Sequence, residues 1–210
     1  MSKIIFVVTG ADIIPNITPI LRRERYIEYM LCLHKIFNYG FPVYGVLSEY
    51  HRENITDMPP FKNFPFKKIM YIDNGTLPSF KKSQCEIISI NALLDNLNSD
   101  EIDDDTFIIK VSGRYLLLED SFIDTVKSNL YSTVQTIVKH NNINHVFTFL
   151  YALRYRYFKG YYESCSQSDI STENSLFFYL KSNNILDKCI NLKRLGILTN
   201  VSNENTFEIV

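Results

Sequence analysis

Residues 107–118, FIIKVSGRYLLL, combine the apolar side chains of a buried strand with charged groups that could bind an anion. Lys110 and Arg114 supply two cations, and an arginine can hold a phosphate or pyrophosphate group through two parallel hydrogen bonds. Ser112 and Gly113 stand between them, and a glycine permits a close approach of the backbone or an unusual φ angle. Cations are costly to bury at a strand end without a partner, so we interpret the segment as an anion site. The alternative is that the two cations neutralise buried carboxylates.

Two carboxylates elsewhere in the chain suit the chemistry of a sugar or a nucleotide. Glu173 stands in the first turn of a predicted helix, where the helix dipole favours an acid in any case. Its functional alternative is a general base, which takes a proton from an acceptor hydroxyl. Asp73 opens an Asp-Asn-Gly sequence that is first a turn signal, and it could also accept hydrogen bonds from a base or a sugar hydroxyl.

Glu86 and the acidic run at residues 103–105 both have structural explanations. Ser83 and Glu86 form the pattern of a capping box, which predicts that they begin a helix. The Asp-Asp-Asp run could hold Mg²⁺ or Mn²⁺, but it precedes a predicted strand. We therefore expect it at the amino end of that strand, as a turn in solvent. The four histidines lack the spacing of metal ligands, so no metal-binding residue is predicted.

Three further polar segments carry weaker signals. Thr9 and Gly10 end a predicted strand and begin a loop that suits a nucleotide, although neither common glycine-rich phosphate motif is present. Residues 22–25, Arg-Arg-Glu-Arg, open a helix where cations oppose the dipole, so they either contact a ligand or pair with neighbouring glutamates. Residues 154–162, RYRYFKGYY, suit single-stranded nucleic acid, the wall of an acceptor pocket, or the packing of an amphipathic segment.

The elements that must position these groups alternate between strands and helices. Buried strands are predicted over residues 4–8, 42–47, 68–72, 107–111 and 146–153. Helices are predicted between the Thr18-Pro19 cap and Gly40, and over residues 83–97, 120–127 and 172–181. The expected apolar face of the first helix consists of Ile27, Met30, Leu31, His34 and Phe37.

This alternation predicts an α/β fold with a mostly parallel central sheet flanked by helices. In such sheets, ligands bind in the crevice at the carboxyl ends of the strands. Thr9, Asp73 and Lys110 should therefore face one crevice.

Length and composition limit the class of protein. The 210 residues predict one domain over residues 1–210, and 22 basic against 23 acidic residues give no net field for nucleic acid or membrane. The apolar run at residues 146–153 is far shorter than the ~20 residues that span a bilayer, so no transmembrane segment is expected. The apolar run at the N-terminus is too short for the hydrophobic region of a signal peptide. The four cysteines are far apart in the sequence, and nothing requires a disulfide. We expect a cytoplasmic protein.

Residues 110–115 resemble the metal-site segment of GT-A-type glycosyltransferases. They are also similar to the corresponding segment of small GT-A-like transferases of bacteria and large DNA viruses, which carry K-x-[ST]-G-R-Y where other families carry D-x-D. The order of other features agrees with this resemblance: the opening strand IIFVVTG, the sequence Arg-Glu-Arg-Tyr at residues 23–26, then Glu86 and Glu173. The resemblance covers most of residues 3–181.

The resemblance implies a single GT-A-like (Rossmann-like) domain that moves a sugar from a nucleoside diphosphate sugar to a glycan or small acceptor. It implies that the nucleotide side of the site comprises Thr9, Gly10, Asp73, Lys110, Ser112, Gly113 and Arg114. Glu173 would be the base, as in inverting members, and a viral member would act in the host cytoplasm. Because D-x-D is missing, Lys110 and Arg114 are expected to meet the charge of the leaving diphosphate in place of Mn²⁺ or Mg²⁺. The alternative is that Asp73 or a carboxylate outside the motif still holds such a metal. Two alternatives are a non-catalytic nucleotide- or sugar-binding domain and a nucleotidyltransferase.

Overall fold

The structure is a computed structural model of the 210-residue chain, and it describes residues 3–10, 18–49, 61–73, 82–97, 102–141, 143–165, 171–201 and 206–209. The strands of the main sheet are β1 (Ile4–Gly10), β2 (Val43–Glu49), β3 (Lys68–Asp73), β4 (Phe107–Ser112), β6 (Thr136–Val138), β7 (Leu150–Arg154) and β8 (Cys189–Asn191). A small sheet contains β5 (Leu116–Leu117), β9 (Ile197–Val201) and β10 (Thr206–Ile209). The helices are α1 (Pro19–Phe37), α2 (Lys82–Leu94), α3 (Ser121–Ser128), α4 (Tyr155–Ser164) and α5 (Thr172–Ser182).

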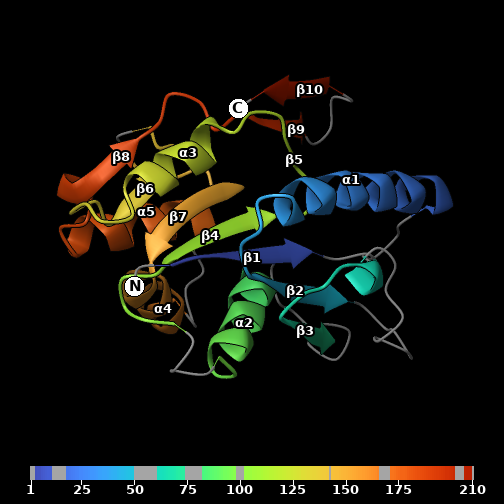
Figure 1. Ribbon diagram of the computed structural model, residues 1–210, viewed down its shortest axis with the longest axis horizontal. Coiled ribbons are helices and arrows are strands. Elements are labelled where there is room, and N and C mark those ends of the chain that lie inside the picture. Colours follow the sequence, from blue (N-terminus) through green and yellow to red (C-terminus); the bar gives the residue numbers. More distant parts are fainter. Residues whose placement is uncertain are drawn as a thin grey trace.

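The main sheet has seven strands in the order β3-β2-β1-β4-β7-β6-β8 (Figure 1). The four strands from β3 to β4 are parallel, β7 runs antiparallel to both of its neighbours, and β8 is parallel to β6. The α/β class with a mostly parallel sheet is therefore confirmed. In the parallel half, the register sets Thr9 beside Ser112 and Glu49 beside Asp73. The carboxyl ends of β1, β2, β3 and β4 thus lie along one edge.

Helices cover both faces of the sheet, as Figure 1 shows. On one face, side chains of α1 and α3 pack with Phe6, Val8 and Ile109 in the first core cluster. On the other face, side chains of α2, α4 and α5 pack with Val7, Ile108 and a second set of strand residues. Because strand side chains alternate between faces, neighbouring residues of β4 serve different cores.

Helix α1 begins as predicted but buries a different face. Thr18 caps it by accepting a hydrogen bond from the backbone N–H of Leu21 at 3.2 Å, and Gly40 follows its end with φ +74°. The buried residues are Arg25, Tyr29, Cys32, Leu33 and Ile36. The predicted apolar face was wrong, because Ile27 and Leu31 are 51% and 50% exposed and His34 is also exposed. The buried and predicted stripes differ by two residues, or about 200° around the helix, so both satisfy helical spacing.

Two other predicted elements have different limits in the structure. The strand expected over residues 146–153 begins only at Leu150, and Val146 makes an isolated bridge with His140. The aromatic run at residues 154–162 is mostly α4, which buries Phe158, Tyr161 and Tyr162. This is the arrangement expected for the packing of an amphipathic segment.

Arg154 precedes α4 and is buried, at 2% exposure. Its guanidinium donates to the carbonyl oxygens of Asp105, Asn129, Ser132 and Val134. It also lies over the ring of Phe107 at 3.8 Å. These contacts account for Arg154 as a structural cation that joins the end of β7 to residues 105–107 and 129–134.

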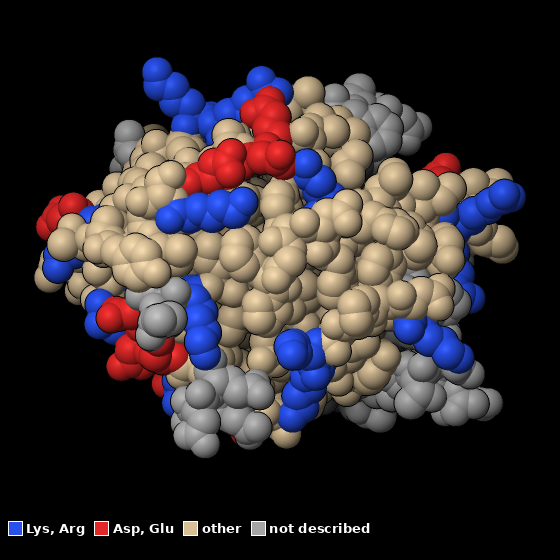
Figure 2. Space-filling model, in the orientation of Figure 1, with Lys and Arg blue, Asp and Glu red and all other residues tan. Residues whose placement is uncertain are grey.

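Membrane-spanning helices are not found among the residues that the structure describes, since none of those helices is both long and apolar enough. On the face shown in Figure 2, lysines, arginines and acids are interspersed around an uncharged centre.

Candidate functional site

Ser112, the last residue of β4, and the three residues before β5 form a tight turn, residues 112–115, which we call the strand-end turn. Its first backbone N–H, that of Ser112, donates to the carbonyl of Phe149 at 2.9 Å. The next, that of Gly113, donates to the carbonyl of Thr9 at 2.8 Å. The N–H of Tyr115 closes the turn on the carbonyl of Ser112 at 3.0 Å. The turn is thus fixed to the end of β1 and to the segment before β7.

Gly113 allows the strand-end turn to lie against α1. A Cβ atom at this position would stand 2.9 Å from Val8 Cγ1 and 3.0 Å from Tyr29 Cδ1, closer than ordinary contacts permit. The close approach that the sequence indicated at Gly113 is therefore an approach to α1. Gly10 has the same relation to α1, because its Cβ would meet Tyr29 and Phe61 at 2.9–3.0 Å.

Arg114 points from the strand-end turn toward α1 and uses only part of its guanidinium there. Its Nε donates to Glu28 Oε2 at 2.9 Å, and the two side chains are 22% and 23% exposed. The terminal nitrogens Nη1 and Nη2 have no acceptor among the described residues. Burial alone would lower the pKa of Arg114, but the hydrogen bond and charge of Glu28 raise it overall. Arg114 is therefore a fixed cation with donors to spare.

Lys110 has the opposite environment. Its side chain is 1% exposed, and its amine donates to Glu86 Oε2 at 3.0 Å, to the carbonyl of Thr148 at 3.0 Å and to Ser112 Oγ at 3.3 Å. An ammonium group has three N–H donors, and these contacts use all of them. The amine therefore joins α2 to β4 as a buried ion pair, which is the alternative that the sequence left open. Its contact with a donor diphosphate stays a prediction.

Glu86 does not form the predicted capping box. Helix α2 begins at Lys82, so Ser83 lies inside the first turn rather than at the cap. The Glu86 carboxylate instead accepts from Lys110, and Thr9 Oγ1 approaches the same oxygen at 3.5 Å. The capping-box prediction was wrong because a buried cation from the sheet competes for this acid.

Glu173 is held by two hydroxyl groups at the start of α5. Thr148 Oγ1 donates to Glu173 Oε1 at 3.1 Å, and Thr172 Oγ1 donates to Oε2 at 3.3 Å. Ser171 caps the helix by accepting from the N–H of Asn174 at 3.3 Å. Both carboxylate oxygens thus have a donor, which restricts the rotation of the side chain.

Thr148 links the two acids of the site. Its carbonyl accepts from Lys110 and its hydroxyl donates to Glu173, so Glu86, Lys110, Thr148 and Glu173 form one hydrogen-bonded chain, which we call the Lys110 cluster. Sequence reasoning missed both Thr148 and Glu28. The signal for Thr148 was a single hydroxyl within the apolar run at residues 146–153. Glu28 had no distinctive signal, since its partner Arg114 is remote in sequence.

The remaining predicted residues lie at the same edge or outside the described part of the chain. Thr9 is 9% exposed at the end of β1, and Asp73 ends β3. The Asp73 side chain and residues 11–17 and 74–81 lie outside the described part of the chain. Of the arginines at residues 22–25, only Arg25 is buried, at 8% exposure.

The acidic run at residues 103–105 lies at the amino end of β4, as predicted. All three side chains are exposed, Asp103 accepts from Thr106 Oγ1 at 2.9 Å and Asp105 pairs with Arg156 at 3.4 Å. No group of three or more His, Cys, Asp or Glu side chains suited to a metal occurs within the part of the chain that the structure describes.

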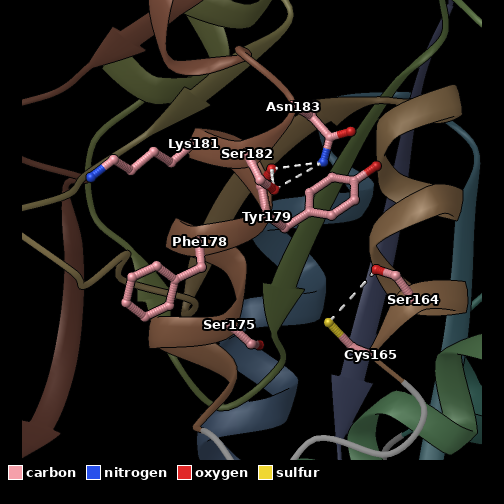
Figure 3. Close-up of a pocket in the computed structure, with 8 residues that line it drawn as sticks. All are labelled: Ser164, Cys165, Ser175, Phe178, Tyr179, Lys181, Ser182 and Asn183. Atoms are coloured by element: carbon pink, nitrogen blue, oxygen red, sulfur yellow. Dashed lines mark hydrogen bonds between the residues drawn. The ribbon is translucent and has the colours of Figure 1, made fainter.

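A separate open pocket of about 870 Å³ lies between α4 and α5 (Figure 3). Its lining includes Cys165, Ser175, Phe178 and Tyr179, and none of the residues of the strand-end turn or the Lys110 cluster. The hydroxyls of Ser164 and Ser182 in its wall already donate to backbone carbonyls. We therefore place the candidate site at the strand ends rather than in this pocket.

Comparison with known proteins identifies the fold. Neither the protein-family models nor the curated proteins include a match to the chain. Among solved structures, 4-diphosphocytidyl-2C-methyl-D-erythritol synthase from Anaerococcus prevotii matches with a TM-score of 0.53 and 12% identity, over 97% of this chain and 95% of that one. A Desulfovibrio desulfuricans protein, described as a nucleotide-diphospho-sugar transferase, matches with a TM-score of 0.53 and 7% identity, over 91% and 80%. The chain therefore has a GT-A-like α/β fold.

Proposed function

We propose that this protein is a glycosyltransferase that moves a sugar from a nucleoside diphosphate sugar to a glycan or small acceptor. The observation that carries the proposal is that Arg114 and Glu173 are both held at the carboxyl-end edge of a GT-A-like sheet. One group offers unused guanidinium donors and the other a carboxylate fixed on both oxygens. The resemblance of residues 110–115 to GT-A-type transferases supports the same function, as does the fold shared with the Desulfovibrio desulfuricans protein.

On the donor side, Arg114 meets the negative charge that grows on the leaving diphosphate. Its Nη1 and Nη2 groups suit two phosphate oxygens, and Glu28 fixes the direction of the guanidinium. Thr9, Gly10, Asp73, Ser112 and Gly113 form the strand-end surface for the nucleotide. The buried Lys110 amine supports this surface, because its hydrogen bonds fix the side chains of Glu86 and Ser112 in place.

On the acceptor side, Glu173 is the general base. The acceptor oxygen attacks the anomeric carbon of the sugar while its proton passes to the Glu173 carboxylate. The bond from the anomeric carbon to the diphosphate oxygen breaks, and the diphosphate leaves with the electron pair. Thr148 and Thr172 hold the carboxylate for this transfer. We propose that Arg114 takes the place of the divalent metal that the D-x-D carboxylates bind in other families.

A nucleotidyltransferase is the second candidate. The Anaerococcus prevotii protein is named as the synthase of a diphosphocytidyl compound, and its TM-score equals that of the Desulfovibrio desulfuricans protein. A non-catalytic binding domain is the third. The products separate the three: glycosyl transfer or donor hydrolysis releases a nucleoside diphosphate, nucleotidyl transfer releases pyrophosphate, and a binding domain releases neither.

The test uses the purified chain with a panel of nucleoside diphosphate sugars and measures released nucleoside diphosphate. Glu173→Gln keeps the size of the side chain but cannot accept the proton, so kcat should fall roughly 10²–10⁴-fold with little change in donor affinity. Glu163→Gln, on the exposed surface of α4, is the matched control and should retain wild-type turnover. Normal turnover by Glu173→Gln would remove Glu173 from the mechanism.

A further inference from the structure

The phenol of Tyr115 ends the strand-end turn in a fixed position. Its ring packs edge-on against Phe149, with centroids 4.9 Å apart and planes at 65°. Its backbone N–H closes the turn, and the next two residues, Leu116 and Leu117, pair with β9. The ring is therefore held by its packing against Phe149. The backbone is held by the hydrogen bond of Tyr115 itself and by the pairing of the next two residues with β9.

The Tyr115 hydroxyl makes no hydrogen bond to any residue that the structure describes. The hydroxyl is therefore available to donate to a ligand, and its position in the chain beside Arg114 makes an anion the ligand to consider. Arg114, its neighbour in the turn, also has terminal nitrogens without an acceptor in the described chain. Two adjacent residues of one rigid turn thus present unused hydrogen-bond donors.

The charges of groups from both helical layers act on this phenol. Burial raises the pKa of Tyr115, the charges of Arg114 and Arg25 lower it, and those of Glu28 and Glu86 raise it, with a net increase. The phenol thus stays protonated at neutral pH and can only donate its proton to an anion. Arg25 and Glu28 belong to α1 and Glu86 to α2, so charges from both sides of the sheet act on this phenol.

We propose that Tyr115 is a second anion-binding group of the site, which donates a hydrogen bond to a phosphate oxygen of the nucleoside diphosphate that Arg114 binds. The inference rests on the proposed function for the identity of the ligand. It adds that Arg114 and Tyr115 act together on the diphosphate, one through charge and the other through a neutral donor of fixed position. Because its position is fixed, this donor favours an anion that can place one oxygen on the tyrosine hydroxyl while other oxygens contact Arg114.

The test is calorimetric titration of the full chain with inorganic pyrophosphate and with the four common nucleoside diphosphates. Tyr115→Phe removes only the hydroxyl oxygen and should weaken binding of each about tenfold, the scale of a hydrogen bond to a charged group. Its melting temperature should match wild type, because the ring and its contact with Phe149 are kept.

Tyr155→Phe is the matched control. Tyr155 is half-buried, its hydroxyl also lacks a partner among the described residues, and it follows β7 at the opposite edge of the sheet. This variant should bind every probe as the wild type does. Equal weakening in both variants would overturn the proposal.

Failure of the inference and failure of the proposed function give different results. Wild-type affinity in Tyr115→Phe would overturn the role of Tyr115 and leave the transferase intact. Weakened binding in Tyr115→Phe, together with no sugar released from any donor, would leave Tyr115 in place and overturn the transferase. A wild type that binds no pyrophosphate and no nucleoside diphosphate would overturn both.

Discussion

Lys110 and Arg114 belong to one short motif, yet the structure gives them different roles. The Lys110 amine is saturated by three acceptors inside the sheet–helix interface, whereas Arg114 keeps two nitrogens for another partner. Charge alone therefore does not make both residues ligands. Substitutions at the two positions should separate a defect in folding from a defect in chemistry.

Arg114→Ala should reduce turnover roughly 10²–10³-fold, the scale of losing one donor to transition-state charge. Arg114→Lys should restore only part of it, since an ammonium cannot form two parallel hydrogen bonds. Chelator should leave wild-type turnover unchanged if Arg114 replaces a metal. Turnover with and without chelator, and melting temperature, are measured on one preparation. Activity lost to chelator and restored by Mn²⁺ would contradict the metal-free mechanism, and an unstable but fully active Arg114→Ala would contradict the anion role.

Lys110→Met should lower the free energy of unfolding by about 3 kcal/mol. Breaking a buried ion pair costs ~3–5 kcal/mol because the partner charge is left alone, and the low end applies since the Glu86 side chain is 24% exposed. Lys159→Met, which breaks an exposed pair with Glu163 at 3.7 Å, should cost under about 0.5 kcal/mol. Denaturant unfolding measures both. A stable Lys110→Met protein that no longer binds diphosphate would make Lys110 a ligand group instead.

At the scale of elements, the strand-end turn depends on the contact between β4 and α1. Gly113→Ala would drive a methyl group into Val8 and Tyr29, so we expect a loss of about 1–3 kcal/mol in unfolding free energy and reduced turnover. Gly160→Ala, inside α4, is the matched control, because the nearest atom is the hydroxyl end of Tyr179, which can move. It should gain up to about 1 kcal/mol from helix propensity. Thermal unfolding that ranks the two variants in the reverse order would contradict this account.

The same elements show what sequence alone could predict. The strands that lead into the site were located within two residues, since continuous apolar runs with clear ends define buried strands. Helix α1 was located but turned to the wrong face, because two stripes with helical spacing differ by half a turn. Glu86 and Glu28 could not be assigned, because their partners Lys110 and Arg114 are close only after folding. Local patterns identify elements, whereas long-range ion pairs decide which charges are left for a ligand.

At the scale of the whole molecule, a bound nucleotide should stabilise the entire fold. A ligand at 100 times its Kd adds about 2.7 kcal/mol to the free energy of unfolding. For a chain of this size, that is a rise of roughly 5–11 °C in melting temperature. A thermal-shift screen over nucleoside diphosphates and their sugars measures it, with nucleosides that lack phosphate as the control. Equal shifts with nucleosides would mean that the phosphates are not bound.

The pairing of β5 with β9 has a consequence for synthesis of the protein. Leu116 lies directly after the strand-end turn, but its partner Leu198 is translated long after it. The backbone N–H groups of residues 118 and 119 donate to the carbonyl of Gly196, which is also translated later. A nascent chain can therefore build the parallel half of the sheet on the ribosome while the strand-end turn still lacks its contacts with β9 and Gly196. The turn becomes fully fixed when the last strands emerge, so the capacity to bind a diphosphate should arise late in translation.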